Sequence, residues 1–170
     1  MNLNIRKAEY GDAEKIAYVH TMSWKVAYAG IIPDEYLNNL SVDDRAEKFR
    51  LYFDKNENTF YFLTELDEKT IGFIVLQECR DKDLKGAGEI CAMYLLPEYF
   101  NKGYGSHMMR FSVNFLANKG YKTIALWVLE ENARARKFYQ KCGFVFDGKK
   151  KKIDIGKPLK VIRYRTEIRV

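Results

Sequence analysis

The chain has 170 residues, 47% hydrophobic and 31% charged, a length and balance that favour one globular domain over residues 1–170. No apolar run approaches the roughly 18 residues of a membrane helix, and the first residues lack the apolar segment of a secretory signal. The net charge of +6 is compatible with nucleic acid and equally with a phosphate-bearing cofactor, but no aromatic RNA-binding signature is present.

The cysteines and histidines argue against two further classes of protein, those held together by disulfides and those that bind a metal ion. Cys79, Cys91 and Cys142 form no CxxC pair, and only His20 and His107 accompany them. A disulfide framework and a metal site both fit this set poorly. We therefore expect a reduced cytoplasmic protein that holds no metal and acts away from membranes.

The first third of the chain predicts one strand and then helices. Residues 3–8 are expected to form the strand, and Asp12 to cap a helix whose apolar positions recur at helical spacing. A loop with Pro33 leads to a short helix. Ser41, with Asp44 three residues on, resembles a capping box and predicts the start of a longer helix.

The middle of the chain predicts strands. Residues 59–66 and 70–79 are rich in β-branched and aromatic side chains, and the intervening Asp-Glu-Lys suits a hairpin turn. Residues 88–96 are apolar rather than alternating, which favours a central strand.

The remainder alternates helices and strands. A helix is predicted from Ser106 to a terminal glycine at Gly120, then a buried strand over 122–129, then a helix over 132–142 ended by Gly143. Segments 144–148 and 160–170 are expected to be closing strands. This order predicts an α/β domain with a mixed sheet and helices packed on it.

A basic run, "GKKKKIDIGKPLK", occupies residues 148–160. The simpler interpretation is a solvated hairpin between two late strands. The alternative is a patch for an anionic partner.

Two glycines two apart, Gly103 and Gly105, stand where a helix begins after a strand. The stretch matches neither the dinucleotide fingerprint, since Met108 stands at the third glycine position, nor a P-loop. Glycines at a helix N-terminus nevertheless let an anion approach unpaired amides and the positive end of the helix dipole. Without further signals, the glycines could equally serve the turn alone.

Two motifs together resemble a known family. "EICAMYLLPEYFNKGYGSHMM" and, some twenty residues later, "LWVLEENARARKFYQKCGF" are similar to the GCN5-related N-acetyltransferases (GNAT). The similarity covers nearly the whole chain. It implies a single-domain GNAT-like fold, with a mixed, mostly antiparallel sheet and a splayed central strand flanked by helices.

The resemblance also implies acetyl-CoA as the acetyl donor and cosubstrate. The backbone of the splayed strand would pair with the pantetheine arm at Met93, Tyr94 and Leu95. Amides of the loop would hold the diphosphate, at Asn101, Lys102, Gly103, Tyr104, Gly105 and Ser106. Lys102 could add charge there or be an ordinary solvated lysine.

The loop departs from the family pattern at two positions. Phe100 stands where Gln or Arg is usual, and Asn101 where Gly is usual. Because the diphosphate would be held by backbone groups, we expect binding to persist, provided that Asn101 adopts the backbone geometry of a glycine.

The second motif places Asn132 and Tyr139 seven residues apart, about two helical turns. Asn132 could cap its helix or, as the resemblance implies, hydrogen-bond the cofactor arm. Tyr139 could pack in the core or act as the general acid, because a phenol with a pKa near 10 is protonated at pH 7 and can donate to a leaving thiolate.

Other candidate groups are less distinctive. Glu89 is our candidate base, directly or through water, with a structural carboxylate as the alternative. A backbone amide near Tyr94 or Leu95 could stabilise the developing oxyanion. Lys141 and Arg136 could meet the ribose phosphate or be exposed helix charges. We expect Cys142 and both histidines to be structural.

The acetyl acceptor is expected between the first helices and the last strands. Trp24, Tyr28 and Tyr36, with Asp34 and Glu35 nearby, would suit a cationic amine through cation–π and charge attraction, although Trp24 could belong to the core.

We therefore expect an acetyl-CoA-dependent N-acetyltransferase, an acyltransferase, acting on a primary amine of a small molecule such as a polyamine, an amino compound or an antibiotic-like amine. Alternatives are a protein N-terminal or lysine acetyltransferase and an inactive acetyl-CoA sensor. A nucleic-acid partner rests on net charge alone, and dimerisation is common among relatives.

Overall fold

Seven strands form one sheet in the computed structural model, which describes residues 2–55 and 58–168. The strands are β1 (Leu3–Lys7), β2 (Phe60–Leu66), β3 (Lys69–Glu78), β4 (Gly88–Leu95), β5 (Thr123–Leu129), β6 (Val145–Asp154) and β7 (Pro158–Glu167). Their order across the sheet is β1-β2-β3-β4-β5-β7-β6. Only β4 and β5 pair in parallel, which confirms the predicted mixed, mostly antiparallel sheet.

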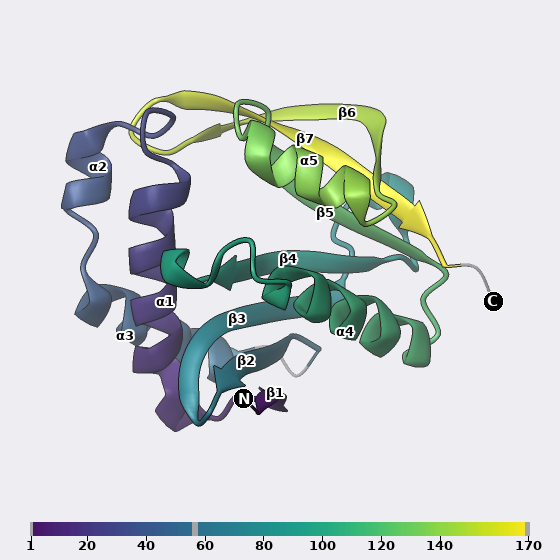
Figure 1. Ribbon diagram of the computed structural model, residues 1–170. Coiled ribbons are helices and arrows are strands. Elements are labelled where there is room, and N and C mark those ends of the chain that lie inside the picture. The colour runs from purple at the N-terminus through teal and green to yellow at the C-terminus, as the bar shows by residue number, and fades with distance from the viewer. Residues whose placement is uncertain (1, 56–57, 169–170) are drawn as a thin grey trace.

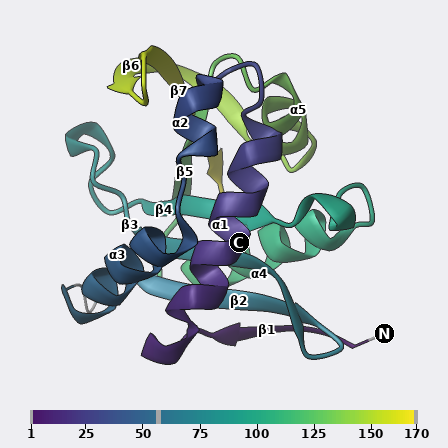
Figure 2. The same ribbon diagram turned by 90° about the vertical axis from the view of Figure 1, so that its left-hand side faces the viewer.

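Helices cover both faces of the sheet (Figure 1). They are α1 (Ala13–Ala27), α2 (Asp34–Asn38), α3 (Val42–Lys55), α4 (Tyr104–Asn118) and α5 (Ala133–Lys141). Figure 2 shows α1, α2 and α3 in front of the strands. None of the helices in the described part of the chain is long and apolar enough to cross a bilayer.

The alternation of side chains along β3 explains the two layers. Phe73 and Val75 pack with α1 and α3, whereas Ile74 and Leu76 pack with α4 on the opposite face. All four are buried, so β3 is apolar on both faces, as expected of an inner strand of the sheet.

A β-bulge opens the sheet at its centre. Ile90 pairs with Leu76 and Ala92 with Val75, so Cys91 is an extra residue in β4. Pairing of β4 with β5 also ends at Ile90, opposite Leu126. Because a bulge bends its strand and increases the local twist, it accounts for the divergence of β4 from β5 toward α1 in Figure 1. The splayed central strand is therefore confirmed.

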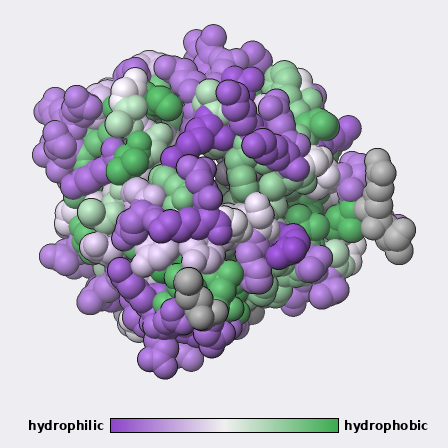
Figure 3. All heavy atoms as spheres, in the orientation of Figure 1, coloured by the Kyte–Doolittle hydropathy of each residue, from purple (hydrophilic) through white to green (hydrophobic). Residues whose placement is uncertain are grey.

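The lysine run lies in an exposed hairpin between the last two strands, as the simpler interpretation predicts, but it corrects the bounds of the first of these strands. Lys149 to Lys152 do not form a hairpin loop; they continue the edge strand β6, and the turn comes later, between Asp154 and Pro158. Charged residues suit an edge strand because they discourage pairing with another chain. Hydrophilic residues dominate the upper edge of Figure 3, where Figure 1 places β6.

Three of these lysines have partners within the chain. The Nζ atom of Lys149 lies 3.3 Å from Asp83, that of Lys150 lies 2.7 Å from Glu130, and that of Lys151 lies 3.9 Å from the centroid of the Trp127 ring. Two lysines of the basic run are thus ion-paired within the chain, and a third lies over an aromatic ring.

Asp12 also differs from its expected role. Its side chain does not cap α1; it accepts hydrogen bonds from Arg6 at 2.7 and 2.9 Å and from the Glu9 amide at 3.0 Å. The hydrogen bonds from Arg6 lower the pKa of Asp12 below its usual range. In contrast, the Ser41 hydroxyl accepts from the Asp44 amide at 3.2 Å, as predicted at the start of α3.

A buried arginine fixes the connection between β3 and β4. Arg163 on β7 is 3% exposed and forms ion pairs with Asp81, Asp83 and Asp147 at 2.7–2.9 Å. The bulge in β6 after Phe146 brings Asp147 to this cluster. The predicted closing strand extends to 170, of which residues 169–170 lie outside the described part.

Candidate active site

The divergence of β4 from β5 leaves one edge of β4 unpaired. From Cys91 to Leu95, β4 pairs only with β3 in the described sheet. Met93, Tyr94 and Leu95 lie on this stretch. Their backbone groups on the β5 side are therefore available to an extended ligand arm, as a neighbouring strand would use them.

The loop after β4 adopts the backbone that the sequence demands. Gly103 is the N-cap of α4 with φ of 86°, a left-handed value. Asn101 also has a positive φ, of 61°. Asparagine tolerates this region better than most residues, so its replacement of the usual glycine keeps the loop geometry.

The first turn of α4 directs backbone amides toward the position that an anion would occupy. Gly103 has no side chain to cap the helix, and the first turn carries no acidic residue. The amides of Gly105 and Ser106 precede the first intrahelical bond, from the His107 amide to the Gly103 carbonyl at 3.2 Å. Such a terminus suits a diphosphate, and these residues fit that group of CoA.

The unusual Phe100 of the loop has a partner on α5. The guanidinium carbon of Arg134 lies 3.9 Å from the centroid of the Phe100 ring, at cation–π distance. Sequence reasoning missed Arg134, because its position in the second motif gave no indication of which loop residue it would meet. The contact places a positive charge beside the loop that lacks the family's usual Gln or Arg. Lys102 instead lies over the Tyr99 ring, with its Nζ 5.6 Å from the ring centroid.

Tyr139 lies on α5 where it meets the sheet. It packs against the core cluster under α4, with ring centroids 5.5 Å from Phe138 and 6.4 Å from Phe144. Its hydroxyl makes no hydrogen bond within the described chain. Burial, followed by the nearby Tyr94 phenol, raises the pKa of Tyr139 well above its ordinary value. The group therefore holds its proton at neutral pH, as a general acid must.

Asn132 takes the capping role. Its Oδ1 accepts a hydrogen bond from the Ala135 amide at 3.1 Å at the start of α5. The hydrogen bond to the cofactor arm stays a prediction.

Glu89 is buried and paired. Its carboxylate accepts hydrogen bonds from Nη2 and Nε of Arg80 at 3.0 and 3.3 Å. Tyr94 lies five positions after Glu89 along β4, roughly 16 Å at the usual strand rise. Its role as base stays a prediction, and at that separation it would need a chain of water molecules.

An aromatic cluster lies on the other face of β4. The Tyr28 and Tyr94 hydroxyls are 3.0 Å apart, and burial raises the pKa of both. The Trp24 ring packs edge-on to Tyr28 with centroids 5.0 Å apart. His20 stacks on Trp24 at 4.5 Å and, as expected, is buried. The predicted acceptor residues Trp24 and Tyr28 are thus brought together beside Tyr94.

Tyr36 lies apart from that cluster. It lines a pocket of about 370 Å³ between α2, α3 and the β6–β7 turn at Gly156. Glu35 lines the same pocket, and so do Arg45 and Lys48, which sequence reasoning did not select.

The remaining candidates are structural or exposed. Arg136 donates to the Glu130 carbonyl at 2.9 Å and to the Tyr164 hydroxyl at 3.3 Å. Burial raises the pKa of Cys142, which makes it a poor nucleophile. Lys141 is exposed. Within residues 2–55 and 58–168, no group of three His, Cys, Asp or Glu is placed to hold a metal ion.

Comparison with known proteins agrees with this geometry. The family model "Acetyltransferase (GNAT) family" matches residues 24–144. Spermidine N(1)-acetyltransferase of Thermoplasma acidophilum is 30% identical over 85% of this chain and 89% of its own length. The N-acetyltransferase YuaI of Bacillus subtilis is 31% identical over 76% of this chain and 73% of its own.

A solved structure extends the likeness to the fold. The PaiA N-acetyltransferase of Thermoplasma acidophilum, solved in complex with coenzyme A, superposes with a TM-score of 0.77 at 26% identity, covering 99% of this chain and 100% of that one. On the match of the family model and the identity to these relatives, the chain belongs to the GNAT family of acetyltransferases.

Proposed function

We propose that this N-acetyltransferase moves the acetyl group of acetyl-CoA directly to a primary amine of a small molecule. The observation that supports this most is the meeting of three features at the opening between β4 and β5. They are the unpaired edge of β4, the uncapped N-terminus of α4 and the protonated Tyr139 hydroxyl.

Different residues would bind the cofactor, orient its arm and donate a proton. Acetyl-CoA supplies the thioester whose carbonyl an amine can attack. The amides of Gly105 and its neighbours bind the diphosphate, and the free backbone of Met93 to Leu95 orients the arm. The hydroxyl of Tyr139 holds a proton that it can donate to the departing sulfur.

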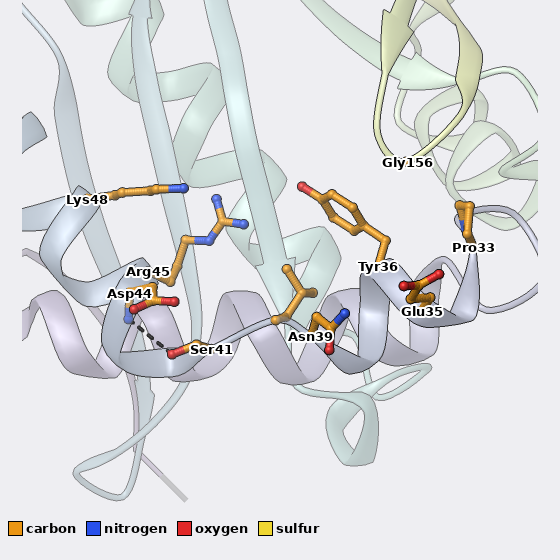
Figure 4. Close-up of a pocket in the computed structure, with 10 residues that line it drawn as sticks. Pro33, Glu35, Tyr36, Asn39, Ser41, Asp44, Arg45, Lys48 and Gly156 are labelled. Atoms are coloured by element: carbon orange, nitrogen blue, oxygen red, sulfur yellow. Dashed lines mark hydrogen bonds between the residues drawn. The ribbon is translucent and has the colours of Figure 1, made fainter.

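One predicted acceptor residue, Tyr36, lines a pocket of small-ligand size (Figure 4), which supports a small molecule rather than a protein as the acceptor. The pocket beside α2 and α3 has a volume of about 370 Å³, which is the range of small-ligand sites. One relative is named for acetylating spermidine, which supports a small amine as the class of acceptor.

The first test replaces Tyr139 by phenylalanine, with Tyr10→Phe as the matched control because Tyr10 is 53% exposed. Release of the CoA thiol is followed with a panel of primary amines. Loss of a general acid lowers kcat by a factor of about 10² to 10⁴. We expect a loss in this range for Tyr139→Phe, an unchanged dissociation constant for CoA, and no change for Tyr10→Phe.

Cofactor binding is tested separately by thermal unfolding with acetyl-CoA, CoA and NADH. A ligand at one hundred times its Kd stabilises the folded state by about 2.7 kcal/mol, which raises Tm by roughly 5–10 °C in a chain of this size. A rise with both CoA species but not with NADH is expected. A CoA-dependent rise without turnover of any amine would instead support the inactive sensor.

A further inference from the structure

Arg134, at the start of α5, is a cation whose N–H groups have no acceptor within the described part of the chain. Its side chain is exposed and makes no hydrogen bond and no ion pair among those residues. The acidic residues nearest in the sequence to this contact, Glu98 and Glu131, are exposed as well and do not pair with it. The guanidinium carbon lies instead 3.9 Å from the centroid of the Phe100 ring. Because a ring face offers no oxygen acceptor, the N–H donors of the guanidinium remain available to a ligand.

The charge of Arg134 stands where a helix disfavours it. The residue lies in the first turn of α5, and a cation there opposes the positive end of the helix dipole. The first turns of α1, α2 and α3 each carry acidic residues, as the dipole favours. Those of α4 and α5 carry none. The two helices that contribute to the cofactor site therefore lack a counter-charge in their first turns, and a bound anion would supply it.

The packing of α5 against α4 places Arg134 beside the diphosphate loop. A Cβ atom on Gly105 would lie 3.5 Å from the Phe138 ring, so this ring covers the first turn of α4. Arg134 precedes Phe138 by four residues and lies on the same face of α5. The guanidinium reaches Phe100, which directly precedes Asn101 and its left-handed backbone. Arg134 thus meets the loop from the side of α5.

We propose that Arg134 binds the diphosphate of acetyl-CoA and that Phe100 is the positioning residue that holds its guanidinium beside the loop. A guanidinium matches two phosphate oxygens with paired N–H donors. The family pattern has Gln or Arg at the place of Phe100, so here an aromatic ring replaces the usual polar side chain and α5 supplies the charge. The inference rests on the proposed use of acetyl-CoA, and it adds a side chain to a site otherwise made of backbone amides.

The test measures ligand binding by calorimetric titration, with no amine present. The two ligands are CoA and dephospho-CoA, which keeps the diphosphate but lacks the 3′-phosphate. Arg134→Gln should raise the Kd of both by the same factor, about tenfold or more, because it removes charge-assisted hydrogen bonds. Arg134→Lys should recover part of the loss, since it restores the charge without the paired donors.

Arg165→Gln is the matched control for this series. Arg165 is exposed on β7, and its neighbour Tyr164 packs into the core cluster on the side of α5. Successive side chains of a strand point to opposite faces, so Arg165 lies on the face away from α5. The substitution removes an exposed arginine in the same way as Arg134→Gln, and it should leave the Kd of both ligands unchanged.

A double-mutant cycle tests the role of Phe100. Phe100→Leu keeps an apolar side chain without the ring, and it should raise the Kd of CoA about 2–5-fold, the range of a cation–π contact at an exposed site. In the Arg134→Gln background the same change should have no effect, because the ring then holds no guanidinium. Phe100→Arg should restore CoA affinity to Arg134→Gln. A ring with only a structural role would give equal losses in both backgrounds, which would refute the positioning role.

An unchanged Kd in Arg134→Gln would overturn the inference, and so would a loss confined to CoA, which would assign Arg134 to the 3′-phosphate. These results differ from a failure of the proposed function. A protein that binds both ligands through Arg134 but acetylates no amine keeps the diphosphate contact and loses only the transfer. Acetylation of an amine with a CoA affinity that is independent of Arg134 keeps the transfer and refutes the contact. An unmodified protein that binds neither ligand would overturn both.

Discussion

His20 should make the stability of this protein depend on pH well above the range in which its carboxylates titrate. The imidazole is 6% exposed and packs among Trp24, Phe49, Phe73 and Tyr94. Burial, followed by the positive charge of Arg45, lowers the pKa of His20 from 6.5 to about 3. The folded protein therefore keeps His20 neutral where the unfolded chain protonates it.

The sign and size of this pH dependence of the free energy of unfolding follow from proton linkage. Between pH 6.5 and pH 3 the unfolded state binds one more proton at His20 than the folded state, so the free energy of unfolding falls as pH falls. For pKa values of 6.5 unfolded and about 3 folded, the loss between pH 7 and pH 5 is about 2 kcal/mol. The pKa of Asp12 is lowered in the folded protein, so its contribution to the free energy of unfolding is lost only at pH values below the pKa that it has in the unfolded chain. Asp12 therefore changes the stability little between pH 7 and pH 5.

Guanidinium unfolding curves at pH 7, 6 and 5 and constant ionic strength measure this loss. The variant His20→Phe keeps an aromatic ring in the cluster but cannot take up a proton, so its free energy of unfolding should change much less over the same range. His107→Gln on α4 is the control and should retain the slope of the unmodified protein. A loss below about 0.5 kcal/mol in the unmodified protein, or an equal slope in His20→Phe, would refute the reasoning.

Three other changes test the roles of single residues. Gly105→Ala should raise the free energy of unfolding by up to about 1 kcal/mol, because the added Cβ meets only Phe138 at 3.5 Å, yet weaken CoA binding measured by calorimetry; unchanged affinity would mean that no ligand approaches this glycine. Arg163→Met should lower the free energy of unfolding by about 3–5 kcal/mol, since three carboxylates lose an ion pair and the side chain of Asp147 among them is 5% exposed, and a loss below 1 kcal/mol in denaturant titration would contradict this account. Glu89→Gln should lower kcat/KM by a factor of about 10² to 10⁴ if Glu89 is the base; a lower Tm with an unchanged kcat/KM would leave it only its pairing with Arg80.

Short stretches of sequence were enough to predict much of the fold. The turn between β2 and β3 has positive φ at Asp67 and Glu68, of 47° and 67°. Asp tolerates this region, whereas Glu68 adopts it because the β2–β3 pairing closes the hairpin with two residues. The positive φ at Asn101 and Gly103 followed from residues that accept it. At Asp67, Asn101 and Gly103 the chemistry of one residue suits the backbone that the structure has.

The lysine run shows where such reasoning fails. Four consecutive lysines have neither the alternation nor the β-branched side chains that predict a strand. They form β6 because β7 supplies a pairing edge and because Asp83, Glu130 and the Trp127 ring receive three of their charges. Those partners come from other parts of the chain, so no window of sequence around the lysines contains the reason.

The cofactor part and the acceptor part of the candidate site also differ in how far short stretches of sequence predict them. The diphosphate loop and Tyr139 belong to two short motifs, so the chemistry shared across the family could be predicted from the sequence. The pocket that Tyr36 lines is built from α2, α3 and the turn at Gly156. The turn lies far from the two helices in the sequence, so no single stretch of the chain contains the reason for the shape or the charges of this pocket. An acceptor bound there would be selected by side chains that only the folded chain brings together, which is why the two motifs do not predict the acceptor.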